Sequence, residues 1–262
     1  MLALAEPATQ KRCDDTAFAA RRPVLHEIKD AGPHCVSCSL QRLCLPLGFE
    51  PDIMHMFDRL IGKRLRLRKG DTLFRPGEHF SALYAIRLGS CKTVLLSEDG
   101  RDQVSGYHMA GDIIGTDGIG TDTHDCQAIA LEDMEVCALP FARVEELAHA
   151  SPRVTQNMHR LLAREISRER HVMLMLGTMR ADQRLAAFLL DLAERYHTRG
   201  YSGSEFVLRM TRDEIGSYLG LKLETVSRLL SRMHREGLIL VQGRVIKLLD
   251  TPQLKRMIDT SA

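Results

Sequence analysis

The sequence lacks any apolar run long enough to cross a membrane. A spanning helix needs roughly 18–20 consecutive apolar residues, and no stretch here approaches that length. Residues 1–5 are also too short for a signal peptide and lack its basic flank. We therefore expect a cytoplasmic protein, and 262 residues that are 44% hydrophobic and 27% charged predict about two globular domains. The net charge of only +2 neither favours nor excludes a nucleic-acid partner.

A second C-x2-C pair is missing as well, although the chain has seven cysteines. Structural zinc usually uses two such pairs, whereas Cys126 and Cys137 are separated by ten residues. Disulfides suit secreted proteins, but the number of cysteines is odd. A 4Fe-4S cluster needs four cysteine ligands, and a C-x2-C-x5-C run with one remote cysteine favours it over zinc and disulfides. The predicted ligands are Cys35, Cys38, Cys44 and Cys126, and the predicted bystanders are Cys13, Cys91 and Cys137.

Glycines separate short apolar runs between about residues 60 and 140, and this pattern predicts many short strands. Examples of such runs are residues 72–74, 82–87, 92–96, 127–131 and 135–139. Short strands with frequent turns are typical of a β-roll or jelly roll.

A long helix is predicted after Ser151-Pro152, because neither glycine nor proline interrupts the chain until Gly177. Apolar residues recur along it at intervals of three, four and seven residues, as in a coiled-coil seam. Packing of this helix on its own domain is the alternative, but its length and its place between two domains favour a dimer seam. Glu169 falls on the seam where an apolar residue is expected. The predicted seam residues are Leu162, Ile166, Glu169, Met173 and Leu176.

Residues 211–236 have the pattern of a helix-turn-helix. Thr211 and Glu214 form a capping box that begins a helix, and Gly220 ends it. A second helix is predicted from about Leu223 to Glu236, and two short helices joined by a tight glycine turn make the motif. Two apolar runs around Gln242-Gly243 then predict a hairpin, so that the unit is winged.

The polar face of the second helix favours DNA binding over a helical corner without a ligand. Arginine can donate two hydrogen bonds to guanine, and glutamate can accept one from cytosine. Between Arg209 and Lys247 there are eight Lys/Arg against four Asp/Glu, a local basic excess that phosphates attract. Lys222 is a weak N-cap but can reach a phosphate. The candidate DNA-binding residues are Thr211, Lys222, Leu223, Glu224, Ser227 and Arg228.

Residues 211–220 followed by 224–230 resemble the helix-turn-helix signature of the CRP/FNR regulators. Residues 83–87 and 111–115 resemble the β-roll of that family, and residues 184–188 resemble its inter-domain helix. The resemblance implies a homodimeric bacterial transcription factor with an α+β fold. The parts within the resemblance are a cluster-binding loop (34–50), a sensory β-roll (51–150), a dimerisation helix (151–180) and a C-terminal winged helix-turn-helix domain (181–262). Residues 1–33 lie outside it, and their composition predicts a mobile tail.

The branch of the family is indicated by four positions. Where cyclic-nucleotide relatives bind ribose and phosphate with glutamate and arginine, this chain has Thr116 and Cys126. In the recognition helix it has Leu223 and Ser227 in place of arginine and glycine. These differences resemble the FNR branch, which implies oxygen sensing through a 4Fe-4S cluster and inverted-repeat operators with half-sites like TTGAT and ATCAA.

The FNR resemblance also implies control of anaerobic genes, by activation or sometimes repression, through contact with RNA polymerase. Residues 98–100 are a candidate surface for that contact. Sensors of nitric oxide, haem or thiol redox state in the same family remain alternatives, as does an iron-sulfur electron carrier. We do not expect an enzyme, because the histidines of the β-roll region lack the H-x-H pair of a cupin metal site: His79, His108 and His124.

Overall fold

The structure is a computed structural model that describes residues 26–27, 35–46, 48–96 and 102–259. Within the predicted tail, only His26–Glu27 is described, as strand β1, which pairs antiparallel with β2 (Lys63–Leu67). Cys13 and the proposed polymerase-contact turn at residues 98–100 lie outside the described residues.

The predicted β-roll is present and consists of two sheets. The five-stranded sheet has the order β1-β2-β9-β4-β7, with β4 at Ala82–Leu88, β7 at Ile113–Ile114 and β9 at Met134–Pro140. The four-stranded sheet has the order β3-β8-β5-β6, with β3 at Thr72–Phe74, β5 at Ser90–Leu96, β6 at Asp102–Met109 and β8 at Cys126–Ala130. Cys126 and Cys137 therefore belong to different sheets.

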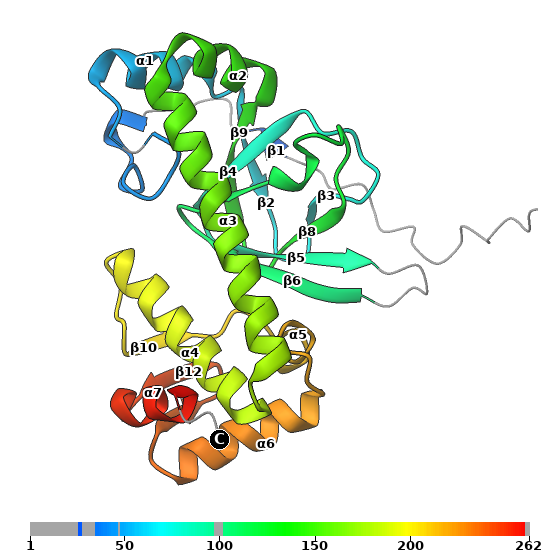
Figure 1. The fold of residues 1–262 in the computed structure, drawn as a ribbon, viewed down its shortest axis with the longest axis vertical. Coiled ribbons are helices and arrows are strands. Elements are labelled where there is room, and N and C mark those ends of the chain that lie inside the picture. Colours follow the sequence, from blue (N-terminus) through cyan, green and yellow to red (C-terminus); the bar gives the residue numbers. More distant parts are fainter. Residues whose placement is uncertain (1–25, 28–34, 47, 97–101, 260–262) are drawn as a thin grey trace, which may run out of the picture.

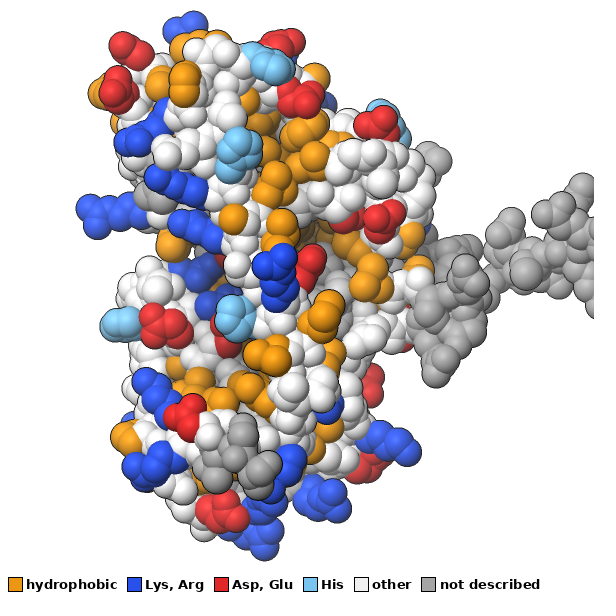
Figure 2. All heavy atoms as spheres, in the orientation of Figure 1, with side chains coloured by type: hydrophobic (Ala, Val, Ile, Leu, Met, Phe, Trp, Pro, Cys, Tyr) orange, Lys and Arg blue, Asp and Glu red, His pale blue; other side chains and the backbone are white. Residues whose placement is uncertain are grey.

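Short helices flank the roll, and one long helix leaves it. The short ones are η1 (Cys35–Ser37), α1 (Pro51–Leu60), η2 (Thr116–Gly118) and α2 (Phe141–Ala150). The long helix α3 (Pro152–Thr178) begins with proline in its first turn and runs from the α1–α2 end of the roll to the C-terminal unit (Figure 1). Apolar side chains form a row along the face that carries α3 (Figure 2). Ile166, Met173 and Leu174 are exposed.

The C-terminal unit is a winged helix-turn-helix, as predicted. Thr211 and Glu214 close the capping box, with the Glu214 amide donating to Thr211 Oγ1 at 3.2 Å and the Thr211 amide donating to Glu214 Oε2 at 2.6 Å. Gly220 ends the first helix in the left-handed conformation, with a φ of 63°. The elements are α4 (Ala181–Thr198), β10 (Glu205–Val207), α5 (Arg212–Leu219), α6 (Leu223–Arg235), β11 (Ile239–Gln242), β12 (Val245–Leu248) and α7 (Thr251–Asp259).

One apolar core joins the roll to the C-terminal unit. Val104, Tyr107 and Met109 of β6 pack in the same buried cluster as Leu185 of α4 and Ile215 of α5. The C-terminal unit is thus docked on the four-stranded sheet of the roll. The predicted α+β fold is confirmed, and no helix of the described part of the chain has the length and apolar character to cross a membrane.

Candidate functional site

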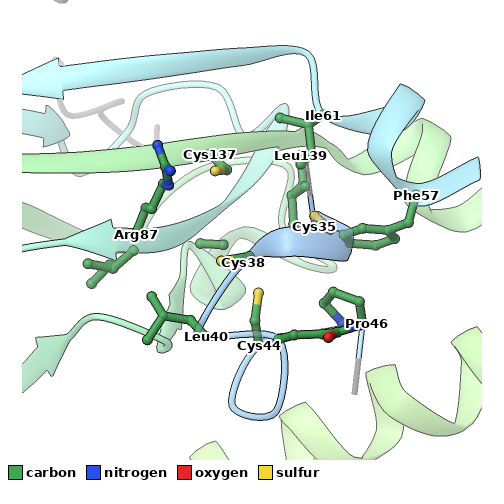
Figure 3. Close-up of a pocket in the computed structure, with 13 residues that line it drawn as sticks. Cys35, Cys38, Leu40, Cys44, Pro46, Phe57, Ile61, Arg87, Cys137 and Leu139 are labelled. Carbon is green, nitrogen blue, oxygen red and sulfur yellow. The ribbon is translucent and has the colours of Figure 1, made fainter. Parts of the chain in front are cut away.

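Four cysteines line one pocket, which we call the cysteine pocket. Cys35, Cys38 and Cys44 come from the N-terminal loop, and Cys137 comes from β9 (Figure 3). Tight turns gather the loop cysteines, with the Cys38 amide donating to Cys35 O at 3.1 Å and the Cys44 amide donating to Leu40 O at 3.0 Å. The other lining residues are largely apolar: Leu40, Gln41, Pro46, Phe57, Ile61, Ala85, Ile86, Arg87 and Leu139.

The loop is fastened at both of its ends. The Cys35 amide donates to Asp58 Oδ1 of α1 at 2.5 Å. At the other end, the buried Asn157 of α3 donates from Nδ2 to Leu45 O at 3.0 Å. The loop that carries three cysteines therefore contacts the first turns of the long helix directly.

Burial favours the protonated thiol at Cys35, Cys44 and Cys137 in the absence of a cation. It raises the pKa of Cys35, with a hydrogen bond from the thiol to the Asp58 carboxylate as the next cause, and it raises the pKa of Cys44 to about 12. The pKa of Cys137 is also raised by burial, but Arg64 and Arg87 act in the opposite direction. Buried thiolates need a compensating positive charge, which bound metal supplies.

Electrostatic coupling among the thiols agrees with their shared pocket. Cys44 and Cys137 both raise the pKa of Cys35, and Cys38 acts on both Cys44 and Cys137. In the described residues, no three His, Cys, Asp or Glu side chains are grouped tightly enough for a single metal ion. Four thiols around an apolar pocket nevertheless match the donor set of a four-iron cluster. The chemistry of the residues therefore fits such a cluster.

Cys126, the predicted fourth ligand, lies in a different place. It lines a cavity of about 460 Å³ between the roll and α3, together with Thr116 and Asp117. Its Sγ lies 3.5 Å from Asp117 Oδ2, which also accepts from the Asp125 amide at 2.9 Å. Burial and then Asp117 raise the pKa of Cys126. The structure does not bring Cys126 to the three loop cysteines, because β8 belongs to the four-stranded sheet and the loop packs on the five-stranded one.

Cys137, interpreted from the sequence as a bystander, takes the place expected for Cys126. In the antiparallel register it pairs with Arg64 of β2 on one side and with Ala85 of β4 on the other. The feature that marks Cys137 as a candidate ligand is its neighbour Arg64, a buried arginine that is only 8% exposed. That feature is visible only once the strands are paired.

Helix α6 presents the predicted DNA-binding face. Glu224 and Arg228 are exposed, and the half-buried Ser227 accepts from Arg212 Nη1 at 3.3 Å. Leu223 is also exposed, and Lys222 is the N-cap, without a side-chain cap hydrogen bond. Thr211 is instead the N-cap of α5, where its hydroxyl accepts from the Glu214 amide in the capping box. Lys and Arg side chains gather at this end of the molecule (Figure 2).

The predicted seam residues share one face of α3, and several of them border the Cys126 cavity. Ile166, Glu169 and Met173 are exposed, while Leu162 and Leu176 are half-buried. Leu162, Ile166 and Glu169 line the cavity. Arg168 pairs with Glu165 at 3.0 Å, and Glu169 has no ion pair within the described ranges.

Known proteins resemble the chain along most of its length. Residues 183–257 match the Crp-like helix-turn-helix domain, and residues 64–151 match the cyclic nucleotide-binding domain. The transcriptional regulatory protein btr of Bordetella pertussis is 45% identical over 86% of this chain and 93% of its own length. The fumarate and nitrate reduction regulatory protein of Escherichia coli is 39% identical over 86% and 90%. Among solved structures, FixK2 from Bradyrhizobium japonicum has 30% identity and a TM-score of 0.70, covering 76% of this chain and 98% of its own.

Proposed function

Because the chain belongs to the CRP/FNR family of transcription regulators, we propose that it is an oxygen-responsive member that carries a 4Fe-4S cluster and binds DNA as a homodimer. The observation that carries this proposal is the cysteine pocket, in which four cysteines from two distant segments meet. It acts in the cytoplasm as a regulator rather than as an enzyme.

The proposed ligands are Cys35, Cys38, Cys44 and Cys137, with Cys137 in place of the Cys126 expected from the sequence. Two arginines support this choice, because Arg64 and Arg87 both favour a thiolate at Cys137. A cluster with four thiolate ligands is anionic when it is in the 2+ state, and nearby cations stabilise it. Bound there, it would supply an oxygen-labile covalent tie between the N-terminal loop and β9.

The conformation of the cysteine loop affects the start of α3 through a direct hydrogen bond. Leu45 accepts the hydrogen bond from the buried Asn157, so an ordered loop holds the first turns of the helix in place. The exposed apolar seam further along α3 then pairs with a second chain. Loss of the tie in air would free the loop and weaken this pairing.

DNA recognition is assigned to α6. Its polar residues face solvent, and a two-fold dimer places two such helices in successive major grooves about one helical turn apart. The family supports an inverted repeat with TTGAT-like and ATCAA-like half-sites, read by Glu224, Ser227 and Arg228. Bound at such a site, the dimer would contact RNA polymerase and control anaerobic genes.

The test compares operator binding under anoxia and in air. Anaerobically purified chain should absorb visible light, contain iron and sulfide, and bind the inverted repeat as a dimer, whereas exposure to air should remove all three properties. Chain that binds the repeat equally in both atmospheres, or that contains no iron under anoxia, would contradict the proposal.

A matched pair of variants tests the reading of the bases. Arg228→Ala should weaken operator binding by roughly 1–3 kcal/mol and relax the preference at the guanine pair. Lys222→Ala is the control, because a phosphate contact should weaken binding to all sequences alike and flatten the salt dependence. Equal losses on operator and random DNA for Arg228→Ala would show a phosphate contact only.

A further inference from the structure

Asp112 gathers arginines from two parts of the chain outside the roll. It follows β6 in a tight turn, and its carboxylate oxygens lie 2.7 Å from Arg195 Nη2 of α4 and 2.7 Å from Nη2 of Arg199, the C-cap residue of the same helix. Arg168 of α3 lies 3.7 Å away. We call these four residues the Asp112 network. Arg195 and Arg199 also donate to backbone carbonyls of β6 and of the turn, at Tyr107 and Ala110.

The network is buried and charged. Burial raises the pKa of Asp112, but the three arginines outweigh it and hold the pKa at about 2, so the carboxylate is ionised. The side chain of Asp112 is 9% exposed and that of Arg199 is 6% exposed. Ion pairs with such geometry are directional, whereas the apolar core between roll and C-terminal unit is not.

The cysteine loop rests on the same turn. Gly111 precedes Asp112 and has a φ of 94°, and a Cβ on Gly111 would lie 2.9 Å from Leu43 Cβ. Leu43 is the neighbour of Cys44, so the side chain next to a loop cysteine packs directly on the turn that holds the arginines. The turn itself is fixed to β4 by two backbone hydrogen bonds with Ile86, at 2.8 and 2.9 Å.

The docked position leaves the recognition helix uncovered. Besides Arg195 of α4, helix α5 contacts the four-stranded sheet, through Lys92 with Glu214 at 2.7 Å and the Val104 amide with Ser217 Oγ at 2.8 Å. Glu224 and Arg228 of α6 remain exposed, and α6 lies on the far side of the C-terminal unit from the roll (Figure 1). Docking therefore orients the helix for DNA rather than hiding it.

We propose that Asp112 is a positioning residue, which sets the orientation of the DNA-binding unit through Arg195 and Arg199 and links it to the cysteine loop through Gly111 and Leu43. The link to the loop rests on the proposed function. It gives each chain a route from the cysteine pocket to the recognition helix that does not pass through the dimer seam.

The test uses anaerobic, cluster-containing dimer and two operators, one with natural half-site spacing and one with an additional base pair between the half-sites. Asp112→Asn should keep the visible absorption and the dimer mass but bind the natural operator about tenfold more weakly. Because a loosely held helix fits several spacings, the variant should also lose less affinity than wild type on the longer operator. Arg199→Gln removes the same ion pair from the arginine side and should show the same two effects. Arg199→Lys keeps the positive charge and should recover part of the affinity.

Asp191→Asn is the matched control, because Asp191 also pairs with Arg195, at 3.6 Å, but is exposed. It should bind both operators as wild type does. If Asp112→Asn loses its cluster, Arg199→Gln decides alone. Wild-type affinity and spacing preference in Arg199→Gln would overturn the proposal, whereas a wild-type chain that ignores the operator would instead refute the proposed function.

Discussion

Cys137 and Cys126 are close in sequence, yet their surroundings differ in charge. Cys137 of β9 lies opposite the buried Arg64 of β2 and near Arg87, and both arginines act to lower its pKa. Cys126 lies beside Asp117 and Asp125, both of which raise its pKa. The first thiol is placed among cations on the sheet that meets the N-terminal loop, and the second among anions on the sheet that meets α3 and the C-terminal unit.

The difference in charge favours Cys137 over Cys126 as the proposed fourth ligand, and it comes from the strand partners of each cysteine rather than from its place in the sequence. A thiolate is stabilised by neighbouring cations and destabilised by neighbouring carboxylates. The proposed function therefore places metal binding at the Cys137 end of the roll and chain pairing at the Cys126 end, where the cavity is lined by Leu162, Ile166 and Glu169.

The strongest test of the comparison is to remove each cysteine in turn. Cys137→Ser should abolish the visible absorption and the bound iron of anaerobic chain, because it removes one of four ligands. Cys126→Ser should retain both, since it leaves the cysteine pocket intact. Iron, sulfide and absorption per chain are measured under anoxia. The opposite pattern would restore Cys126 as the fourth ligand.

The second test addresses the pairing end. Glu169 is exposed on α3 beside Ile166, and in a symmetric dimer the two carboxylates would approach each other. Glu169→Ala should therefore tighten aerobic dimerisation about tenfold, which is about 1.4 kcal/mol, and allow operator binding in air without a cluster. Sedimentation of the aerobic variant measures this. Glu165→Ala is the control on the same helix, because Glu165 pairs with Arg168. A Glu169 variant that stays as monomeric as wild type would show that the side chain only faces solvent.

The third test removes the buried cation beside Cys137. Arg64→Gln should still bind the cluster, but the reduction potential should fall, by the order of tens of millivolts, because a nearby positive charge stabilises the added electron. Dye-mediated titration of the anaerobic chain gives the potential. Arg66→Gln is the control, since Arg66 is exposed and pairs with Glu135 at 2.7 Å. Equal shifts in both variants would mean that only the total charge matters.

The smallest effect is expected at the Cys126 thiol. The pKa of this thiol is raised first by burial and next by the nearby Asp117 carboxylate. Asp117→Asn should lower that pKa, so that more thiolate is present at a given pH and alkylation of Cys126 accelerates a few-fold. Mass spectrometry of the labelled peptide at several pH values follows the rate. Asp125→Asn should act more weakly, and an unchanged rate in Asp117→Asn would show that burial alone protects the thiol.

Local features were predictable from the sequence, and strand pairing was not. The Thr211–Glu214 box and Gly220 fix α5 within a few residues, and the sequence therefore predicted them correctly. The three loop cysteines are equally local and lie together in one pocket, as expected. The remote cysteine is different, because Cys137 meets the loop only through the pairing of β9 with β2 and β4. No spacing along the chain encodes that register.

The apolar core shared by β6 and the C-terminal unit limits how far the protein can be treated as separable modules. Val104, Tyr107 and Met109 belong to the roll in sequence, but they are buried against the DNA-binding unit. A chimera that exchanged residues 181–262 alone would leave these side chains facing a foreign surface or water. A functional exchange between relatives would thus have to include strand β6 together with residues 181–262. The part of the chain that must be exchanged as a unit therefore begins inside the roll.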